Sequence, residues 1–372
     1  MIFDYLVVGA GFAGAVLAER LASQMDKKVL VVDRRNHIGG NCYDYYDDHG
    51  ILVHKYGPHI FYTSSNEVWS YLSQFTEWHP YQHRVLALVD GQKIPVPFNL
   101  NSLYQVFPQQ QAARIEERLV ASFGRGKKIH IVDFLQVEDE LLQELASFVY
   151  EKIYYNYSRK LWGVDPQQLD PRVMGRVPFC IDRDNRYHAD TYQGMPLQGY
   201  HRLFEKMLSH PNISLLLEKD YKEILGETHF KKMVYTGPLD YFFDYQFGPL
   251  PYKSLRWEWQ TQQKEFYQEV AVVNYPNDYD YLRITEFKHL HGYTGSETTI
   301  SLEYPCHYEP GVNDPIYPLL IDESLARHRQ YQEVTEKFKA VYFLGRLPQY
   351  DHANMSQVIM KALATFAEIA RD

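Results

Sequence analysis

The chain of 372 residues is longer than one ordinary hydrophobic core requires, so we expect two or three domains or subdomains. Its 45% hydrophobic and 23% charged residues are typical of a globular protein, and no apolar run approaches the roughly 20 residues that span a membrane. The formal net charge of −9 argues against a general nucleic-acid-binding surface, so an anionic ligand needs a local cationic site.

Cysteine usage and the N-terminus indicate the compartment. Cys42, Cys180 and Cys306 lie far apart and form no C-x-x-C pair, which favours reduced thiols over a disulfide framework or a metal site. The N-terminus carries Asp4 where a secretion signal needs positive charge. We therefore expect a cytoplasmic protein without a bound metal.

The first forty-one residues show the pattern of a dinucleotide-binding unit. An apolar stretch ends at Val8, the turn Gly9-x-Gly11-x-x-Gly14 opens a helix, and a second apolar run ends on Asp33. Gly9 permits the tight turn, Gly11 lets the backbone approach a pyrophosphate, and Gly14 lets the helix pack on the strand. The helix N-terminus attracts phosphates, and Asp33 can accept from a ribose hydroxyl.

Further segments favour FAD over NAD as the dinucleotide. Gly39, Gly40 and Asn41 offer more backbone N–H groups near a pyrophosphate. Gly345 and Arg346, after a C-terminal strand, could bring a guanidinium to the same cofactor. A long flavin nucleotide needs contacts from several chain segments, which these additions would supply.

Residues 43–49 are polar and aromatic and predict a loop and turn. Gly57-Pro58 predicts another turn, with His59 directly after it, and residues 65–75 predict a helix. A histidine in a turn is more often structural than catalytic. The nearness of His59 to the glycine motifs nevertheless favours a cofactor contact.

Residues 84–98 predict a hairpin around Asp90-Gly91, and residues 137–153 predict an amphipathic helix. An aromatic cluster at residues 154–162 then leads into a segment whose two prolines and two glycines predict a mobile loop. This loop carries Arg176 and is typical of a lid over a ligand. The alternative is an ordinary connection with a surface arginine.

The C-terminal half alternates between strand and helix patterns. Residues 199–208 predict a helix, and residues 213–218 and 232–236 predict strands. Alternating segments at 255–261, 267–273, 281–287 and 298–303 predict an antiparallel sheet with one buried face. Residues 340–346 predict a short buried strand, and residues 355–371 predict an amphipathic helix.

The 32 tyrosines allow two interpretations. Most would serve core or interface packing, but some could line a site for a sugar or nucleobase, where flat amphipathic rings stack and hydrogen-bond.

Eight ordered motifs carry a resemblance over essentially the whole chain. They are Gly9-x-Gly11-x-x-Gly14, Ile38-Gly39-Gly40-Asn41, Gly57-Pro58-His59-Ile60-Phe61, Tyr157-Ser158-x-Lys160-x-Trp162, Asp184-Asn185-Arg186-Tyr187, Thr236-Gly237-Pro238-Leu239-Asp240, Arg283-Ile284-Thr285-Glu286-Phe287-Lys288-His289 and Gly345-Arg346-Leu347. In these motifs the sequence resembles the bacterial-type UDP-galactopyranose mutases.

The resemblance implies an isomerase that contracts the pyranose ring of a nucleotide-diphospho-hexose to a furanose, by attack of flavin N5 on the anomeric carbon. It implies FAD in the reduced form, with NAD(P)H or another donor as reductant, a nucleotide-sugar substrate, a homodimer, and a place in the synthesis of galactofuranose for cell-surface polysaccharides.

Pattern and resemblance together predict an α/β fold: a Rossmann-type FAD-binding domain with an inserted helical domain and an antiparallel β-sheet domain. The FAD-binding domain comprises residues 1–78, 197–240 and 335–372. The helical domain, with its mobile substrate loop, comprises residues 99–175. The antiparallel-sheet substrate domain comprises residues 79–98, 176–196 and 241–334.

The resemblance also assigns roles by position. Arg176 and Arg283 would clamp the diphosphate, and His59 would lie against the isoalloxazine. Substrate would be bound by Tyr157 under the base, Trp162 on the closing loop, and Tyr187 and Tyr317 at the phosphates. The expected cofactor contacts are Gly9, Gly11, Gly14, Asp33, Gly39, Gly40, Asn41, Gly345, Arg346 and Met355.

The sugar-side positions depart from the family pattern. Tyr62 and His83 stand where the family has histidine and asparagine, and His352 and Asn354 lie where it has a tyrosine–aspartate pair. These four residues are expected to face the hexose. Two interpretations stay open: a modified galactose, such as a 6-deoxy or 2-acetamido sugar on UDP or dTDP, or neutral drift on UDP-galactose. A conventional FAD oxidoreductase and a non-catalytic flavoprotein that binds nucleotide sugars are further alternatives.

Overall fold

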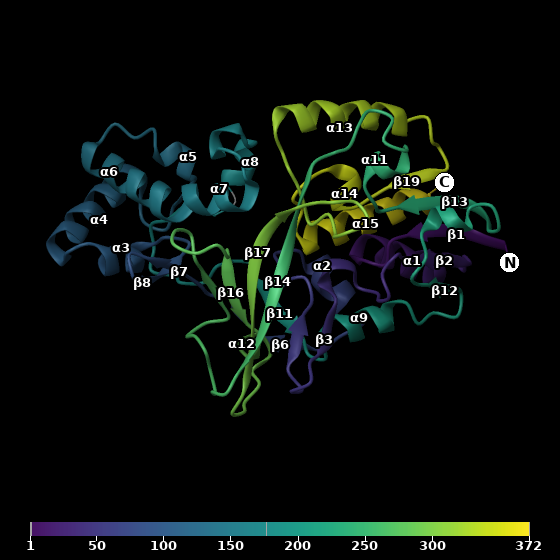
Figure 1. Ribbon diagram of the computed structural model, residues 1–372, viewed down its shortest axis with the longest axis horizontal. Helices are drawn as coiled ribbons and strands as arrows, with labels where there is room; N and C mark the ends of the chain where they lie inside the picture. Colours follow the sequence, from purple (N-terminus) through teal and green to yellow (C-terminus); the bar gives the residue numbers. More distant parts are fainter. Residues whose placement is uncertain (1, 176, 372) are drawn as a thin grey trace.

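The computed structural model describes residues 2–175 and 177–371. Five parallel strands form the sheet at the end of the molecule that holds both termini (Figure 1). Their order is β12 (Ile213–Leu216), β2 (Val29–Val32), β1 (Ile2–Val8), β13 (His229–Tyr235) and β19 (Val341–Phe343). Val8 pairs with both Val32 and Tyr235, so three strands end side by side. Ligands of parallel sheets bind beyond such carboxyl ends.

One long helix packs on this sheet, and a second packs on the first. Helix α1 (Phe12–Met25) follows the glycine turn and lies against α15 (Met355–Ile369), which closes the chain. The small face of α1, with Ala15 and Ala18 fully buried, lets the two helices approach closely. The first and last parts of the chain therefore build one layer.

A seven-stranded sheet occupies the middle of the molecule (Figure 1). Its order is β18 (Tyr317–Pro318), β14 (Tyr252–Gln262), β17 (Thr298–His307), β16 (Arg283–Glu286), β15 (Val272–Asn274), β7 (Val85–Val89) and β8 (Gln92–Val96). The predicted hairpin is confirmed, with Asp90 and Gly91 at its turn. The predicted antiparallel sheet is confirmed for β14, β15, β16 and β17, and one further pair, β15 with β7 of the hairpin, runs parallel. Because a long stretch of chain connects β7 to β15, the two strands could pair in either the parallel or the antiparallel direction.

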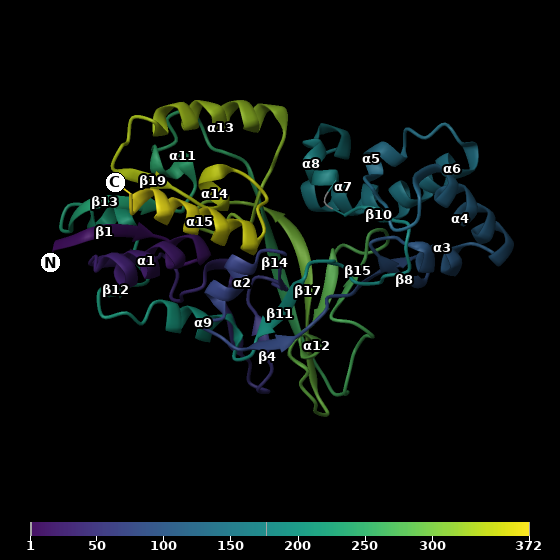
Figure 2. The same ribbon diagram turned by 180° about the vertical axis from the view of Figure 1, so that it is seen from behind.

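Helices gather at the end opposite the termini, as the two opposed views agree (Figures 1 and 2). They are α3 (Leu100–Val106), α4 (Gln109–Phe123), α5 (Ile131–Phe134), α6 (Glu140–Val149), a π-helical turn (Tyr150–Tyr155), α7 (Asn156–Trp162) and α8 (Pro171–Met174). A two-stranded ladder, β9 (Lys128–Ile129) with β10 (Phe179–Cys180), closes this layer.

Short elements connect the layers. The strands are β3 (Asp44–Tyr46), β4 (Leu52–His54), β5 (Phe61–Thr63), β6 (Trp78–Pro80) and β11 (Tyr192–Pro196). The helices are α2 (Asn66–Leu72), α9 (Gly199–Met207), α10 (Tyr221–Ile224), α11 (Leu239–Phe242), α12 (Lys288–His291), α13 (Asp322–Thr335) and α14 (Arg346–Gln349), and two 3-10 turns lie at Gly40–Cys42 and Pro166–Gln168. Among the described residues, no helix is both long and apolar enough to cross a membrane.

Several predicted elements needed correction. Residues 43–49 contain strand β3, because the buried carboxylate of Asp44 accepts the backbone N–H groups of Tyr200 and His201 and holds the segment in place. Of the strand predicted at 267–273, only the last residues are extended, in β15 (Val272–Asn274). The backbone N–H groups of Tyr267 and Gln268 donate to the carboxylate of Glu286 and are therefore not available to a neighbouring strand.

The helix predicted at 137–153 begins later, at Glu140, and widens into a π-helical turn after Val149. Strand β19 is half-buried rather than buried, since it lies at the sheet edge. Helix α13, which the predicted boundaries place with the antiparallel sheet, packs near α14, where His328 Nε2 lies 2.9 Å from the Pro348 carbonyl oxygen.

Candidate active site

A cavity of about 1020 Å³ brings together residues from all three layers. The predicted site residues on its wall are Gly9, Gly11, Asp33, Gly39, Gly40, Asn41, His59, Tyr62, His83, Tyr157, Trp162, Tyr187, Arg283, Tyr317, Gly345, Arg346, Asn354 and Met355. Gly14 and His352 do not line this wall, and Arg176 lies outside the described residues.

The glycine turn forms one end of the cavity. Gly9 has a φ of 105°, which side chains rarely tolerate, and a Cβ on Gly14 would lie 2.0 Å from the Gly9 carbonyl oxygen. Gly11 is the N-cap of helix α1 and offers no side-chain cap, and the first turn of the helix contains no acid. The first N–H groups of α1 are therefore left for an anionic ligand.

Asp33 organises the same end through its carboxylate. The carboxylate accepts the N–H of Ala10 at 2.8 Å and the N–H of Arg35 at 2.9 Å. Asp33 therefore holds the glycine turn against the end of β2 and also lies at the cavity wall, and its contact with a ribose hydroxyl stays a prediction.

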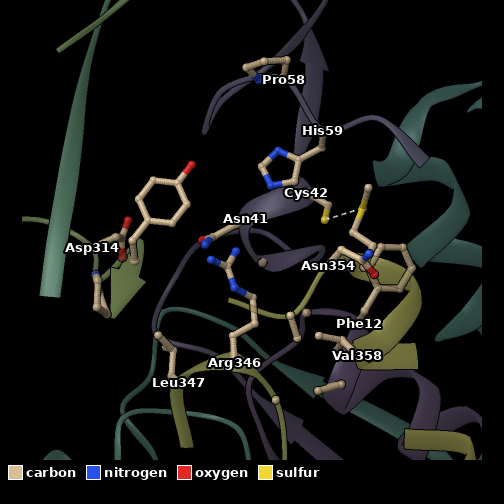
Figure 3. A pocket seen from close by; sticks show the side chains of 18 of the residues that line it. Phe12, Asn41, Cys42, Pro58, His59, Asp314, Arg346, Leu347, Asn354 and Val358 are labelled. Atoms are coloured by element: carbon tan, nitrogen blue, oxygen red, sulfur yellow. Dashed lines mark hydrogen bonds between the residues drawn. The ribbon is translucent and has the colours of Figure 1, made fainter. Parts of the chain in front are cut away.

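His59 and Arg346 point into the same space on either side of Asn41 (Figure 3). His59 Nδ1 donates to the Gly57 carbonyl oxygen at 2.9 Å, so Nε2 keeps its lone pair. Burial lowers the pKa of His59 to about 4, and the charges of Arg346 and Arg283 act in the same direction. His59 is therefore a neutral hydrogen-bond acceptor at neutral pH.

Arg283 places a cation in the wall of the cavity. Its Nε donates to Glu303 Oε1 at 2.8 Å, and its Nη2 lies 2.8 Å from the same oxygen as an ion pair, across the paired strands β16 and β17. Burial acts to lower the pKa of Arg283, but the Glu303 carboxylate outweighs it, and the pKa lies well above its ordinary value. The pair is a fixed, charged element that can meet an anion.

Aromatic residues from α7 and β18 surround this cation. Tyr157, Trp162 and Tyr317 all line the cavity, and the Trp162 and Tyr317 rings meet edge to face at 5.9 Å. Behind them, His352 stacks on Trp162 at 5.1 Å, and its Nε2 lies 2.7 Å from the Pro318 carbonyl oxygen. His352 thus supports the aromatic wall from outside the cavity.

Three of the residues that depart from the family pattern, Tyr62, His83 and Asn354, line the cavity around His188. The Tyr62 ring stacks on His188 with centroids 3.4 Å apart, and Asn354 Nδ2 donates to the Tyr62 hydroxyl at 3.4 Å. His83 lies parallel to His188 with ring centroids 6.4 Å apart, and its Nδ1 lies 3.0 Å from the Tyr81 hydroxyl. Burial lowers the pKa of His83 to about 3.

Sequence reasoning missed several residues of the wall. His188 is the most important, although it directly follows the predicted Tyr187. Arg35, two residues after Asp33, donates to Asn41 Oδ1 at 2.9 Å and pairs with Asp314 at 3.0 Å. Cys42 donates to the Met355 sulfur at 3.5 Å (Figure 3). The signal in the sequence that could have indicated these residues is their position next to motif residues that were predicted.

The free energy of unfolding of the apoprotein is expected to fall between about pH 7 and about pH 5. His59 and His83 have folded-state pKa values of about 4 and about 3, below their ordinary value of 6.5. The contribution of these two neutral histidines to the free energy of unfolding is complete above pH 6.5. It is lost as the pH falls, because the unfolded chain takes up protons that the folded chain does not. At pH 5 each histidine should lower the free energy of unfolding by about 2 kcal/mol.

Urea unfolding at the two pH values measures this loss. A variant with both histidines replaced by asparagine should show a clearly smaller difference between the two pH values. An equal difference in the variant and the parent protein would contradict the assignment.

Comparisons with known proteins agree with this geometry. Residues 152–352 match a family model described as UDP-galactopyranose mutase, and residues 7–75 match an NAD(P)-binding Rossmann-like domain. A "Probable UDP-galactopyranose mutase" from Klebsiella pneumoniae is 36% identical, covering 98% of this chain and 94% of its own length. A dTDP-fucopyranose mutase from Escherichia coli is 32% identical, covering 96% of each chain.

Solved structures show the same fold. The crystal structure of a reduced UDP-galactopyranose mutase has a TM-score of 0.72 at 15% identity, covering 100% of this chain and 94% of the other. Cyclohexylamine oxidase from Brevibacterium oxydans has a TM-score of 0.59 at 13% identity, with full coverage of both chains.

Proposed function

The chain belongs to the UDP-galactopyranose mutase family and is an isomerase of that type, and we propose that it contracts the pyranose ring of a nucleotide-linked galactose with FAD in this cavity. One observation carries the proposal. The glycine turn, which suits a dinucleotide, lines the same cavity as Arg283, whose guanidinium suits a diphosphate and is paired with the buried carboxylate of Glu303.

The residues present fit a flavin nucleotide. The uncapped N-terminus of α1 offers N–H donors to a pyrophosphate, and Asp33 lies where a ribose hydroxyl could donate to it. His59 and Asn41 lie further along the cavity, beside Arg346 (Figure 3). When bound in the reduced form, the flavin would supply the nucleophile for the anomeric carbon.

The protein's own residues would hold the rest of the reactants. Arg283 would neutralise the diphosphate as it departs, because its guanidinium donates in a fixed fork and stays charged. Tyr317 and Tyr187 would donate hydroxyl protons to phosphate oxygens, and Tyr157 would stack on the base. Trp162 would exclude water. Arg176, which lies outside the described residues, is proposed as the second clamp.

The sugar end of the cavity favours a modified hexose. Tyr62 presents a ring face where the family pattern has a histidine, and its hydroxyl is engaged by Asn354. An aromatic face stacked on His188 suits the methyl group of a 6-deoxy or acetamido sugar better than a free hydroxyl. The name of the Escherichia coli relative, dTDP-fucopyranose mutase, supports this choice. The reductant and a homodimeric state stay predictions.

Substrate preference is expected to favour a modified sugar. Reduced enzyme assayed with UDP-galactose, UDP-N-acetylgalactosamine and dTDP-fucose should prefer one of the last two by about 10-fold or more in kcat/KM, the range of one pocket contact. Tyr62→His should move the preference toward UDP-galactose, whereas Tyr62→Phe, which keeps the stack, should leave it unchanged. A clear preference of the parent enzyme for UDP-galactose would remove the modified-sugar proposal.

A further inference from the structure

His54 ends strand β4 directly before the turn that carries His59. Its side chain is fully buried and does not belong to the cavity wall. The ring packs between Tyr200, Phe287 and His291, each with its centroid 5.8 Å away. A hydrophobic side chain could fill such a place, so the use of histidine there calls for another reason.

The reason lies in one hydrogen bond across the turn. The backbone N–H of His59 donates to His54 Nδ1 at 3.0 Å. A backbone N–H is always a donor, so His54 Nδ1 must be unprotonated and the proton must lie on Nε2. His54 Nε2 lies 3.5 Å from Nε2 of His291, which ends the short helix α12 after strand β16. Burial lowers the pKa of His54 well below its ordinary value, which keeps Nδ1 as an acceptor.

His59 is therefore held at two points. Its peptide N–H is fixed by His54, and its ring is fixed by the donation from Nδ1 to the Gly57 carbonyl oxygen. Gly57 has a φ of 81°, so this turn has a shape that other residues would strain. The two bonds together set the direction in which His59 Nε2 faces the cavity (Figure 3).

We propose that His54 is a positioning residue for the flavin face of the site: it aims the His59 peptide and ring at the bound cofactor. The proposal rests on the proposed function in that His59 is taken to contact a flavin. It adds a residue that lies outside the cavity and acts only through His59.

Three substitutions separate this role from packing. In His54→Asn, a short side chain can still offer an oxygen near the place of Nδ1. In His54→Gln, the amide reaches the place of Nε2 and keeps only the contact with His291. In His54→Leu, neither polar contact remains. The visible absorption spectrum of bound FAD and kcat are measured for each variant, with the melting temperature as a check on folding.

His54→Leu and His54→Gln are expected to shift the flavin spectrum and lower kcat by about 100-fold, the usual cost of a small misplacement. His54→Asn should recover the spectrum and bring kcat to within about threefold of the parent. In a His59→Ala background, His54→Leu should cost less than about threefold, because the residue it acts through is gone.

Equal effects of His54→Leu in the two backgrounds, or equal effects of the three substitutions, would overturn the proposal and leave His54 a packing residue. The flavin spectrum keeps this test apart from that of the proposed function. If the parent protein isomerises no nucleotide hexose, the function fails, while the spectra of the same variants still decide the role of His54.

Discussion

Replacement of Arg283 by alanine is expected to lower kcat by about 1000-fold while FAD remains bound, because a preorganised cation at a departing anion contributes most in the transition state. The guanidinium lies in the cavity wall with its pKa well above the ordinary value, so it stays charged throughout the reaction. Steady-state kinetics of the reduced enzyme measure the loss, and flavin absorbance reports the bound cofactor.

The Arg283→Ala variant also leaves the buried Glu303 carboxylate without its charged partner, which costs about 3–5 kcal/mol of stability. A double variant, Arg283→Gln with Glu303→Gln, removes both charges and should recover most of that stability without recovering turnover. Arg256→Ala is the matched control, because Arg256 forms an exposed pair with Glu258 on strand β14 of the same sheet. Parent-like turnover in the double variant would contradict the role of Arg283.

Replacement of Gly14 by alanine is expected to lower FAD affinity by about 100-fold, although Gly14 does not line the cavity. The new Cβ would lie 2.0 Å from the Gly9 carbonyl oxygen and 2.9 Å from Val7 Cγ1. Helix α1 must then move away from the turn, which misaligns its first N–H groups. The same overpacking should cost about 2–3 kcal/mol of stability.

Fluorescence titration of the apoprotein with FAD, and urea unfolding, measure the two effects. Gly226→Ala is the control, because a Cβ at Gly226 meets nothing within 4 Å. Gly226→Ala should change the free energies of FAD binding and of unfolding by no more than about 0.5 kcal/mol, the range of ordinary surface substitutions. Parent-like FAD affinity in Gly14→Ala would show that the close packing of turn and helix is not needed for the cofactor.

Local patterns were the best guides to the fold. The glycine turn, the Asp90-Gly91 hairpin and the helix after Ser65 each depend on a few neighbouring residues. The parallel pairing of β15 with β7 could not be predicted, because nothing local sets the direction of strands joined by a long connection. The irregular path at Tyr267 depends on Glu286, a residue from another strand.

In the site, too, residues within local motifs could be predicted, whereas residues brought in by long-range contacts could not. Motif residues such as Gly9, His59 and Arg283 were predicted and meet in one cavity. Glu303, the partner of Arg283, was not predicted, because this pairing follows from the register of strand β16 on strand β17. His188 was missed because its stack on Tyr62 joins distant parts of the chain.

The central claim is that the chain isomerises a nucleotide hexose with a reduced flavin in this cavity. It is tested most directly by incubating the purified, FAD-loaded protein with the three nucleotide sugars under anaerobic conditions, with and without dithionite, and separating the products by chromatography. The account predicts a furanose product only in the reduced sample, without net consumption of reductant. Oxidation of the sugar in proportion to flavin reduction, with no furanose formed, would contradict it and indicate a conventional oxidoreductase.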